Sequence, residues 1–505
     1  MRLFALLAWL PLLAQPPAAR APRPEAQKPA AAKPAPDETP VVRKHELNVG
    51  GRVLRYTTTA GLMPIRDAKG ETEAHIFYMA YALDGVADPA KRRLMFSFNG
   101  GPGSASVWLH LGAIGPKRVP MRDDGAMPAP PFQLIPNDST LLDEADLVFI
   151  DPVGTGYSRP VKPELQAKFS SRQGDIESVG EFIRLYLTRN KRWLSPLFLI
   201  GESYGTTRAA GLAGYLIDRG IAFNGIALIS TILNFQTSRF ARGNDLPFPL
   251  ILPTYTATAW YHKKLSPELQ KMDLRKLLRE VEAWALTGYS EALALGDRMT
   301  PAQRKATVER LARYTGLDPS YVDRAELRIE LPYFNRELLR DRGLMVGRLD
   351  SRLTGPGPRD LSGTYEFDPS MTAIRPPYTA ALYQYVRAEL GYESDLDYYI
   401  LGGGIGRWDM NAQNEYADVS DSLRRAFARN PFLKVYLGAG YYDMATPFSA
   451  AYYTLDHMGL TPNLRANIRV HEYPAGHMYY IHAESLAAMK RDLASFLAWA
   501  APVPE

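Results

Sequence analysis

The sequence predicts an α/β fold in which a mostly parallel central sheet is flanked by helices and carries a mainly helical insertion. Four short apolar runs, bounded by Gly or Asp, begin at residues 94, 147, 197 and 226. Fully apolar runs of this length are typical of parallel strands that are buried on both faces. Helix-compatible segments such as DIESVGEFIRLYL at residue 175 separate the runs. With 505 residues and 46% hydrophobic content, the chain can fill a large core.

The N-terminus is expected to be a targeting segment followed by a linker. An early Arg2 precedes an apolar run that is too short to span a membrane and ends in small residues, so residues 1–19 are predicted to be a secretory signal peptide. An uncleaved anchor is the alternative, although no stop-transfer pattern follows. Residues 20–44 are rich in Ala and Pro and are predicted to be a disordered linker. We therefore expect an exported protein, periplasmic or secreted, without stable membrane insertion.

The composition excludes several classes of function. The chain has no cysteine, which excludes disulfides, a thiolate nucleophile and Cys-ligated zinc, and suits a bacterial envelope setting. The net charge is only +5 and no basic patch interleaved with aromatic residues occurs, so nucleic acid is not an expected partner. No phosphate-binding loop and no metal-ligand spacing is present, so neither a cofactor nor a metal is expected. The oligomeric state is left open.

The domain organisation follows from where the strand patterns stop and resume. Residues 45–234 are predicted to be the first part of the α/β core, and their alternating segment at 45–85 should enter the sheet as antiparallel strands. Residues 235–415 carry charged amphipathic stretches and are predicted to be a helical cap. Residues 416–505 should complete the core, since they contain two further strand patterns. A cap after the fourth core strand would cover the sheet edge where α/β folds bind ligands.

The segment LFLIGESYG, residues 197–205, makes Ser203 a candidate nucleophile. A strand that ends in Gly-x-Ser-x-Gly and runs directly into a helix is the pattern that lifts a serine hydroxyl out of a sheet. A plain strand-turn-helix with an ordinary serine is the alternative, so the candidate depends on partners elsewhere in the chain.

A base and an orienting acid are expected later in the chain, at the ends of later strands. Asp443 follows the strand pattern VYLGAG, and His477 follows IRVHEYP in a Gly-bounded loop. Each residue alone could have a purely structural role, Asp443 as a turn or helix cap and His477 as a loop residue. Both, however, occur in the chain order serine, acid, histidine that this chemistry requires. Other candidates fit less well: Asp350 as an alternative acid, His471 within a strand, His482 at the last helix, and Asp456 with His457 inside a helical stretch.

An oxyanion hole would complete this chemistry. The backbone N–H of Tyr204, directly after the serine, is one expected donor. The segment FSFNGGPGSAS, residues 96–106, supplies a glycine-rich loop after an earlier strand, and its glycines would let the backbone approach a substrate closely.

Five motifs, in this order, resemble the serine carboxypeptidase family: NGGPGS at 99, DPVGTGYS at 151, GESYG at 201, YD at 442 and GHM at 476. The resemblance implies an α/β-hydrolase fold with a helical cap, and hydrolysis of a C-terminal peptide bond through an acyl-enzyme. It implies Ser203 as nucleophile, His477 as base and Asp443 as its orienting acid. The amides of Gly101 and Tyr204 would be the oxyanion donors.

The resemblance also implies that Asn99 and Glu202 help to bind the terminal carboxylate of a peptide, and Gly100 and Met478 are further expected substrate-binding residues. Two positions depart from the family: Ser97 replaces a Trp, and Ala113 stands where a second Glu is expected. Without that partner, Glu202 is predicted to have less reason to stay protonated. Activity should then persist to higher pH than in the family's acid enzymes, or the substrate is not a peptide. An esterase or acyltransferase with the same triad, and a catalytically silent binding protein, are the alternative functions.

Overall fold

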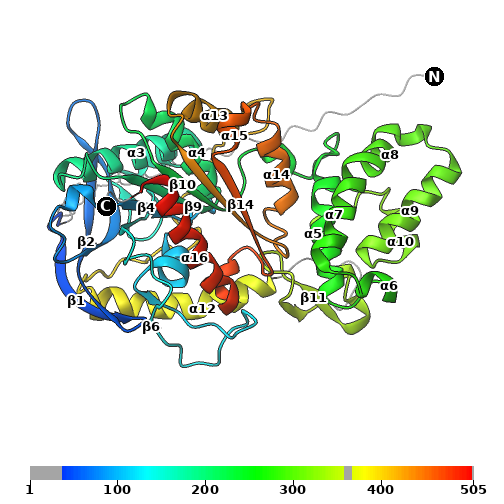
Figure 1. The fold of residues 1–505 in the computed structure, drawn as a ribbon, viewed down its shortest axis with the longest axis horizontal. Helices are drawn as coiled ribbons and strands as arrows, with labels where there is room; N and C mark the ends of the chain where they lie inside the picture. The colour runs from blue at the N-terminus through cyan, green and yellow to red at the C-terminus, as the bar shows by residue number, and fades with distance from the viewer. Residues whose placement is uncertain (1–36, 358–366, 503–505) are drawn as a thin grey trace, which may run out of the picture. The chain divides into compact units, whose positions relative to one another are not determined.

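A ten-stranded sheet forms the centre of the structure, a computed structural model that describes residues 37–357 and 367–502 (Figure 1). The strand order is β1-β2-β3-β7-β4-β9-β10-β13-β14, and β8 pairs with β3. The sheet strands are β1 Val41–Val49, β2 Arg52–Arg66, β3 Thr72–Leu83, β4 Leu94–Phe98, β7 Asp146–Ile150, β8 Arg159–Pro160, β9 Leu197–Ser203, β10 Gly225–Thr231, β13 Lys434–Gly440 and β14 Ile468–Tyr473.

Parallel and antiparallel pairing divide the sheet as the sequence predicts. Strands β1 to β3 pair antiparallel with their neighbours, and β3 is antiparallel to β7. From β7 through β4, β9, β10, β13 and β14 every pair is parallel. The α/β fold class with a mostly parallel sheet is therefore confirmed.

The predicted start of ordered structure is wrong by a few residues. Strand β1 begins at Val41 and pairs with β2 through Val41 and Ala60, so residues 41–44 belong to the sheet and not to the linker. The long strand β2 offers pairing partners along this whole segment, which composition alone does not reveal. The predictions for residues 1–19 and for residues 20–36 of the linker lie outside the described residues.

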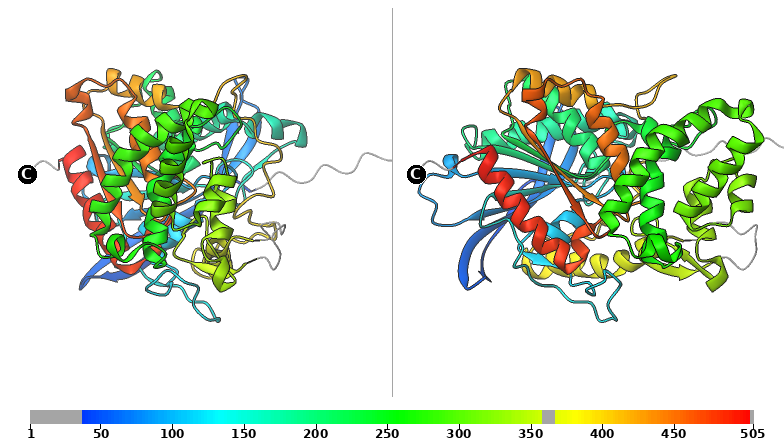
Figure 2. Two further views of the ribbon diagram at one scale, coloured as in Figure 1. Left: turned by 90° about the vertical axis from the view of Figure 1, so that its right-hand side faces the viewer. Right: turned by 45° about the vertical axis from the view of Figure 1, so that its right-hand side comes forward.

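Each buried strand contributes side chains to two hydrophobic layers, because successive side chains point to opposite faces of the sheet. In β4, Leu94 and Phe96 join the layer under α3 Arg172–Arg189, α4 Tyr204–Ile217 and α13 Ser420–Arg429. Met95 joins the opposite layer, under α16 Ala483–Ala500 and α12 Pro369–Gln384. Figure 2 shows α16, in red, lying across the sheet.

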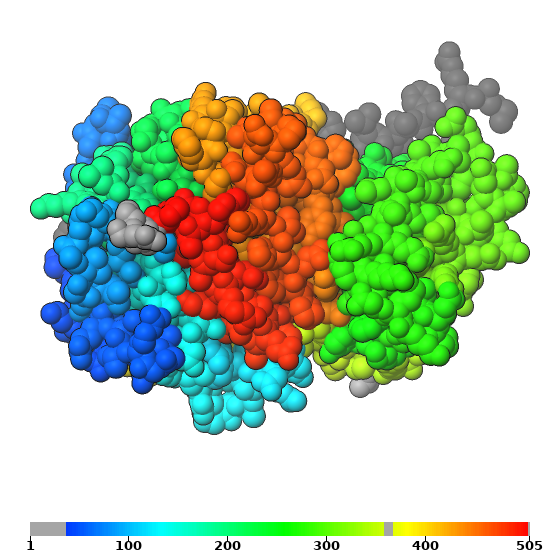
Figure 3. Space-filling model, viewed as in Figure 1, coloured from blue at the N-terminus to red at the C-terminus, as the bar shows by residue number. Residues whose placement is uncertain are grey.

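A group of helices lies between β10 and β13 in the chain and has its own hydrophobic cluster. These helices are α5 Pro247–Tyr261, α6 Pro267–Gln270, α7 Leu274–Trp284, α8 Ser290–Leu295, α9 Pro301–Thr315, α10 Pro319–Arg324 and α11 Leu331–Glu337. Helix α5 packs against α14 Phe448–Asp456, and the green and orange surfaces adjoin in Figure 3. A two-stranded sheet, β11 Leu344–Val346 with β12 Thr354–Pro356, follows the helices.

Helix α12 belongs to a different layer although it lies within the predicted cap, residues 235–415. Its Ile374 and Tyr378 are part of the hydrophobic cluster of the central sheet, and Tyr378 contacts the ring of Trp108. The boundary of the cap at residue 415 stays a prediction. In the described part of the chain, no helix combines the length and the apolar character needed to cross a membrane.

Candidate active site

Ser203 is the last residue of β9 and directly precedes α4. Its backbone has φ 59° and ψ −129°, a region that side-chain-bearing residues rarely adopt. The flanking glycines make this turn possible: a Cβ on Gly201 would lie 2.2 Å from the carbonyl oxygen of Gly205, and a Cβ on Gly205 would lie 2.9 Å from that of Phe98. The Gly-x-Ser-x-Gly spacing is thus explained by the tightness of the turn.

Asp443 and His477 follow the adjacent parallel strands β13 and β14, and their side chains meet. Oδ2 of Asp443 lies 2.7 Å from Nδ1 of His477, and both residues are buried. The other carboxylate oxygen accepts the backbone N–H groups of Ala445 and Thr446. Ser230 donates a hydrogen bond of 2.6 Å to the carbonyl of His477 and so fixes the loop. The acid is therefore held in place from its own turn while it orients the imidazole.

The protonation of His477 reflects two opposing effects. Burial lowers the pKa of the imidazole, but the nearby Asp443 carboxylate raises it, and the net result is a pKa above the ordinary 6.5. This is the behaviour expected of a base that becomes an imidazolium during a reaction.

The competing residues have other partners. Asp350 accepts hydrogen bonds from Arg352 and from the backbone N–H of Gly476, not from a histidine. The competing histidines have other contacts: His471 stacks on Tyr436, His482 contacts Ser485 at the start of α16, and His457 stacks on Tyr453. Asp456 forms an ion pair with Arg465.

A cavity of about 130 Å³ brings most of the predicted site together. Its lining includes these sequence-predicted residues: Asn99, Gly100, Gly101, Glu202, Ser203, His477 and Met478. Tyr204 is buried beside it, and a Cβ on Gly100 would lie 2.4 Å from the backbone nitrogen of Tyr204. The glycine-rich loop thus packs against the amide that follows the serine, where an oxyanion hole would form.

Asn99 links this loop to the helix behind it. Its Oδ1 accepts the backbone N–H of Leu109, and its carbonyl oxygen accepts a hydrogen bond of 2.6 Å from Nη1 of Arg208 on α4. Arg208 also forms a buried ion pair with Asp175 of α3. Nδ2 of Asn99 is buried near the Glu202 carboxyl and makes no well-formed hydrogen bond within the described residues. This amide therefore belongs to the same buried polar cluster as Glu202 and Tyr480.

Glu202 keeps its proton for a reason that the sequence did not reveal. The side chain is buried, which raises its pKa to about 7. The hydroxyl of Tyr480 donates a hydrogen bond to Oε2 of this carboxyl. The prediction that Glu202 has less reason to stay protonated is therefore wrong, because desolvation does what a second carboxyl at position 113 was expected to do. Ala113 and Ser97 are themselves buried.

Sequence reasoning missed several residues of the cavity. Met371 and Ile374 come from α12, and Arg348 and Leu349 come from the segment after β11. No local motif marks them, because only long-range packing brings them to the serine. Tyr480 had a signal, since it stands three residues after His477 in AGHMYY. Within residues 37–357 and 367–502, no group of three or more His, Asp or Glu side chains is placed to hold a metal ion.

The fold and this geometry define a class of protein. A serine at a strained strand-to-helix turn, with an acid and a histidine after later strands of a mostly parallel sheet, is the arrangement of the α/β-hydrolases.

Comparison with protein families agrees with the motifs: the family model described as serine carboxypeptidase matches residues 51–285. Serine carboxypeptidase-like 13 of Arabidopsis thaliana is 26% identical over 202 residues, which cover 34% of this chain and 45% of the relative. The pheromone-processing carboxypeptidase KEX1 of Fusarium vanettenii is 27% identical over 152 residues, 30% of this chain and 22% of the relative. The first half of the chain thus resembles the serine carboxypeptidase family. The matched segments span less than half the length of these relatives.

A solved structure extends the similarity of fold beyond the matched segments. The crystal structure of the prohormone-processing carboxypeptidase Kex1 from Saccharomyces cerevisiae superposes with a TM-score of 0.54. The match covers 88% of this chain and 91% of that one at 15% identity. At this identity the superposition shows a shared fold.

Proposed function

We propose that the protein is a serine-type carboxypeptidase that hydrolyses C-terminal peptide bonds through an acyl-enzyme. The observation that carries this proposal is one cavity that contains Ser203 and His477 together with Asn99 and Glu202. The first pair supplies acyl-transfer chemistry. The second supplies a buried amide donor and a carboxyl group that is protonated up to about neutral pH.

The chemistry follows from the roles of these groups. Oγ of Ser203 attacks the carbonyl carbon of the last peptide bond while Nε2 of His477 takes its proton, and Asp443 stabilises the imidazolium. The amides of Gly101 and Tyr204 donate to the oxyanion. The imidazolium returns the proton to the leaving amine, which departs as a free amino acid. Water, deprotonated by His477, then releases the shortened peptide and regenerates the serine.

Recognition of the terminal carboxylate is assigned to Asn99 and Glu202, which line the same cavity. Nδ2 of Asn99 and the protonated carboxyl of Glu202 would each donate a hydrogen bond to it. Gly100 lets the loop pack closely against the backbone of Glu202 and Tyr204, and Met478 provides an apolar contact. This assignment explains why a carboxyl group would be buried next to the catalytic histidine.

Mass spectrometry of a peptide panel tests the proposal. The protein should remove residues one at a time from the C-terminus, and it should leave C-terminally amidated copies of the same peptides intact. Ser203→Ala should abolish both this release and labelling by a fluorophosphonate, with an unchanged thermal transition. Equal cleavage of the amidated peptides would contradict the proposal, since it would show that the terminal carboxylate is not recognised.

The same panel separates the alternative functions. Turnover of small esters with no peptide trimming would favour an esterase, and transfer to an added alcohol would favour an acyltransferase. A folded protein that the fluorophosphonate does not label would favour a binding role. Export, periplasmic or secreted, is part of the proposal, and N-terminal sequencing of the protein from cell fractions tests it.

A further inference from the structure

Arg348 lies at the junction of two cavities. It is exposed and lines the cavity of Ser203 and His477. It also lines a second cavity of about 240 Å³, whose walls are largely apolar and include Phe240, Leu331 and Met444. The two cavities share Arg348 and Ala445 as lining residues. The two cavities therefore adjoin at Arg348.

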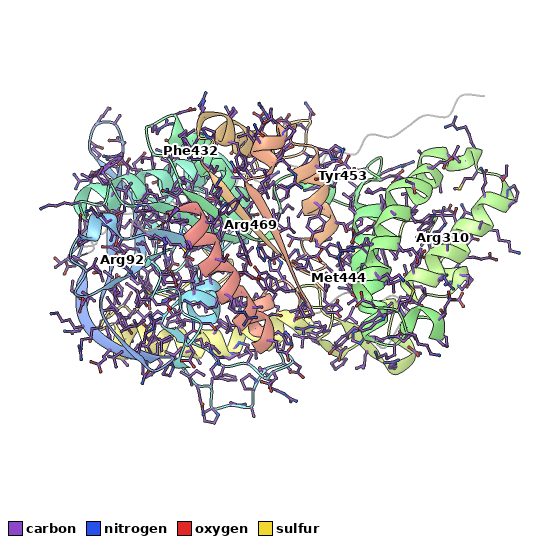
Figure 4. All side chains as sticks on the ribbon, in the orientation of Figure 1. Arg92, Arg310, Phe432, Met444, Tyr453 and Arg469 are labelled. Atoms are coloured by element: carbon purple, nitrogen blue, oxygen red, sulfur yellow. The ribbon has the colours of Figure 1, made fainter. Side chains whose placement is uncertain are left out.

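The backbone of this arginine is fixed to the catalytic loops. Its carbonyl accepts a hydrogen bond of 3.1 Å from the N–H of Met444, the residue after Asp443. The next carbonyl, of Leu349, accepts one of 2.6 Å from the N–H of His477. Figure 4 places Met444 where the ribbon of the C-terminal segments meets the helices of the insertion. The backbone at Arg348 is thus hydrogen-bonded to the loops that carry Asp443 and His477.

The guanidinium has no carboxylate partner among the residues that the structure describes. Two acids close to it in the chain have other hydrogen-bond partners. Oδ1 of Asp368 accepts the backbone N–H of Arg348 and the N–H and hydroxyl of Ser370, and Asp350 pairs with Arg352. Glu202 in the same cavity is protonated up to about neutral pH because it is buried. Among residues 37–357 and 367–502, this permanent cation therefore lines the cavity without an ion-pair partner of its own.

We propose that Arg348 binds a carboxylate of the substrate and so makes the site selective for anionic substrates. A guanidinium group recognises a carboxylate through paired, charge-assisted hydrogen bonds. The proposal rests on the proposed function of the cavity. The carboxylate has two possible sources: the C-terminus of the leaving residue, or an acidic side chain on the acyl side.

A binding experiment tests this without requiring turnover. The probes are 3-phenylpropanoate and its neutral amide, 3-phenylpropanamide, titrated calorimetrically into the full chain and its variants. The wild type should bind the carboxylate at least about tenfold more tightly than the amide. Arg348→Met should lose most of this preference, and Arg348→Lys should keep part of it. Arg298→Met, which removes an exposed cation of the insertion outside both cavities, is the matched control and should behave as the wild type.

Two outcomes of this titration overturn the proposal. One is a wild type that binds both probes equally or binds neither at millimolar concentration. The other is an Arg348→Met protein that retains the preference with an unchanged thermal transition. The titration does not depend on catalysis, because no bond is broken. A wild type that prefers the carboxylate probe but trims no peptide would therefore support the role of Arg348 and contradict the proposed function.

Kinetic pairs then distinguish the two sources of the carboxylate. The first pair is an N-blocked dipeptide ester with a free carboxylate in its leaving group, against the same compound with that carboxylate methylated. The second pair carries Glu or Gln on the acyl side of the scissile bond. The pair whose kcat/KM ratio falls about tenfold in Arg348→Met, but not in Arg298→Met, identifies the source. Arg348→Glu should invert the same ratio, and unchanged ratios in both pairs would exclude a role in selectivity.

Discussion

The hydroxyl of Tyr480 donates a hydrogen bond to Oε2 of Glu202, the residue that precedes Ser203, and both residues are buried. The carboxyl is cut off from water, which raises its pKa to about 7, while the hydrogen bond from Tyr480 favours the charged form and opposes this rise. His477 nearby has a pKa above its ordinary 6.5. Burial and the neighbouring charges thus shift the pKa of both groups upward, and Glu202 ionises only near neutral pH.

The first prediction concerns the pH dependence of kcat/KM. His477 must be neutral to act as a base, and Glu202 must be protonated to donate to a terminal carboxylate. The kcat/KM of an N-blocked dipeptide should therefore fall on the acid side as His477 is protonated and on the alkaline side as Glu202 ionises, and the two apparent pKa values belong to the coupled pair. A neutral ester, which lacks the carboxylate, should keep the acid limb and lose the alkaline one.

Tyr480→Phe provides the control for that profile. Without the hydroxyl, the charged form of Glu202 loses a hydrogen bond, so the alkaline limb for the dipeptide should move to higher pH. The acid limb should stay near its wild-type position. A wild-type profile that falls sharply above pH 5 would contradict this account of Glu202.

The second prediction concerns stability. The folded-state pKa of Glu202 is raised from 4.5 to about 7, so the folded protein prefers the neutral carboxyl. The stability linked to this proton is fully present below about pH 4.5 and is lost as the pH rises through about 7. Glu202→Gln is always neutral and should be more stable than the wild type at pH 8, by a few degrees in Tm, with little difference at pH 4. Scanning calorimetry at pH 4 and pH 8 measures the difference in Tm between Glu202→Gln and the wild type. An equal difference at both pH values would contradict the prediction.

The residues of the candidate triad could be selected from the sequence because each one stands in a local pattern. Ser203 lies between two glycines at a strand end, and Asp443 and His477 follow strands that are neighbours in the sheet. The parallel order of those strands brings their carboxyl ends to one edge, so chain order alone was enough to group the residues.

The environment of the site could not be predicted in this way. The pKa of Glu202 depends on burial by residues distant in the chain, and Arg348 reaches the cavity because its segment pairs with the loops of both Asp443 and His477. Helix α12 has a helical pattern like those of the cap, and only its partners, among them Trp108, show that it packs on the sheet. Local patterns carry no information about such contacts.

A third prediction tests the assignment of the acid. Asp443→Asn should lower kcat by about 10⁴-fold, because the amide cannot stabilise the imidazolium or hold its tautomer. Asp350→Asn is the matched control, since Asp350 is equally buried but pairs with Arg352. It should reduce kcat far less than Asp443→Asn. Comparable losses in the two variants, with both proteins folded by circular dichroism, would argue that Asp443 is not the orienting acid.

The last prediction concerns the ion pair of Arg208 and Asp175, which lies behind the glycine-rich loop. Both side chains are almost fully buried, and Arg208 also donates to the carbonyl of Asn99. Arg208→Met would leave the Asp175 carboxylate buried without its cation, which costs about 3 to 5 kcal/mol in comparable pairs. The loss should appear as a lower urea midpoint, together with a lower kcat because the loop of Asn99 and Gly101 loses its support.

The double variant Arg208→Met with Asp175→Asn separates these two effects. Removing both charges should recover part of the stability, since no buried charge is left unpaired. The kcat should remain low, because the hydrogen bond to the carbonyl of Asn99 is still missing. If kcat recovered together with the urea midpoint, Arg208 would act on activity only through stability and would not position the loop.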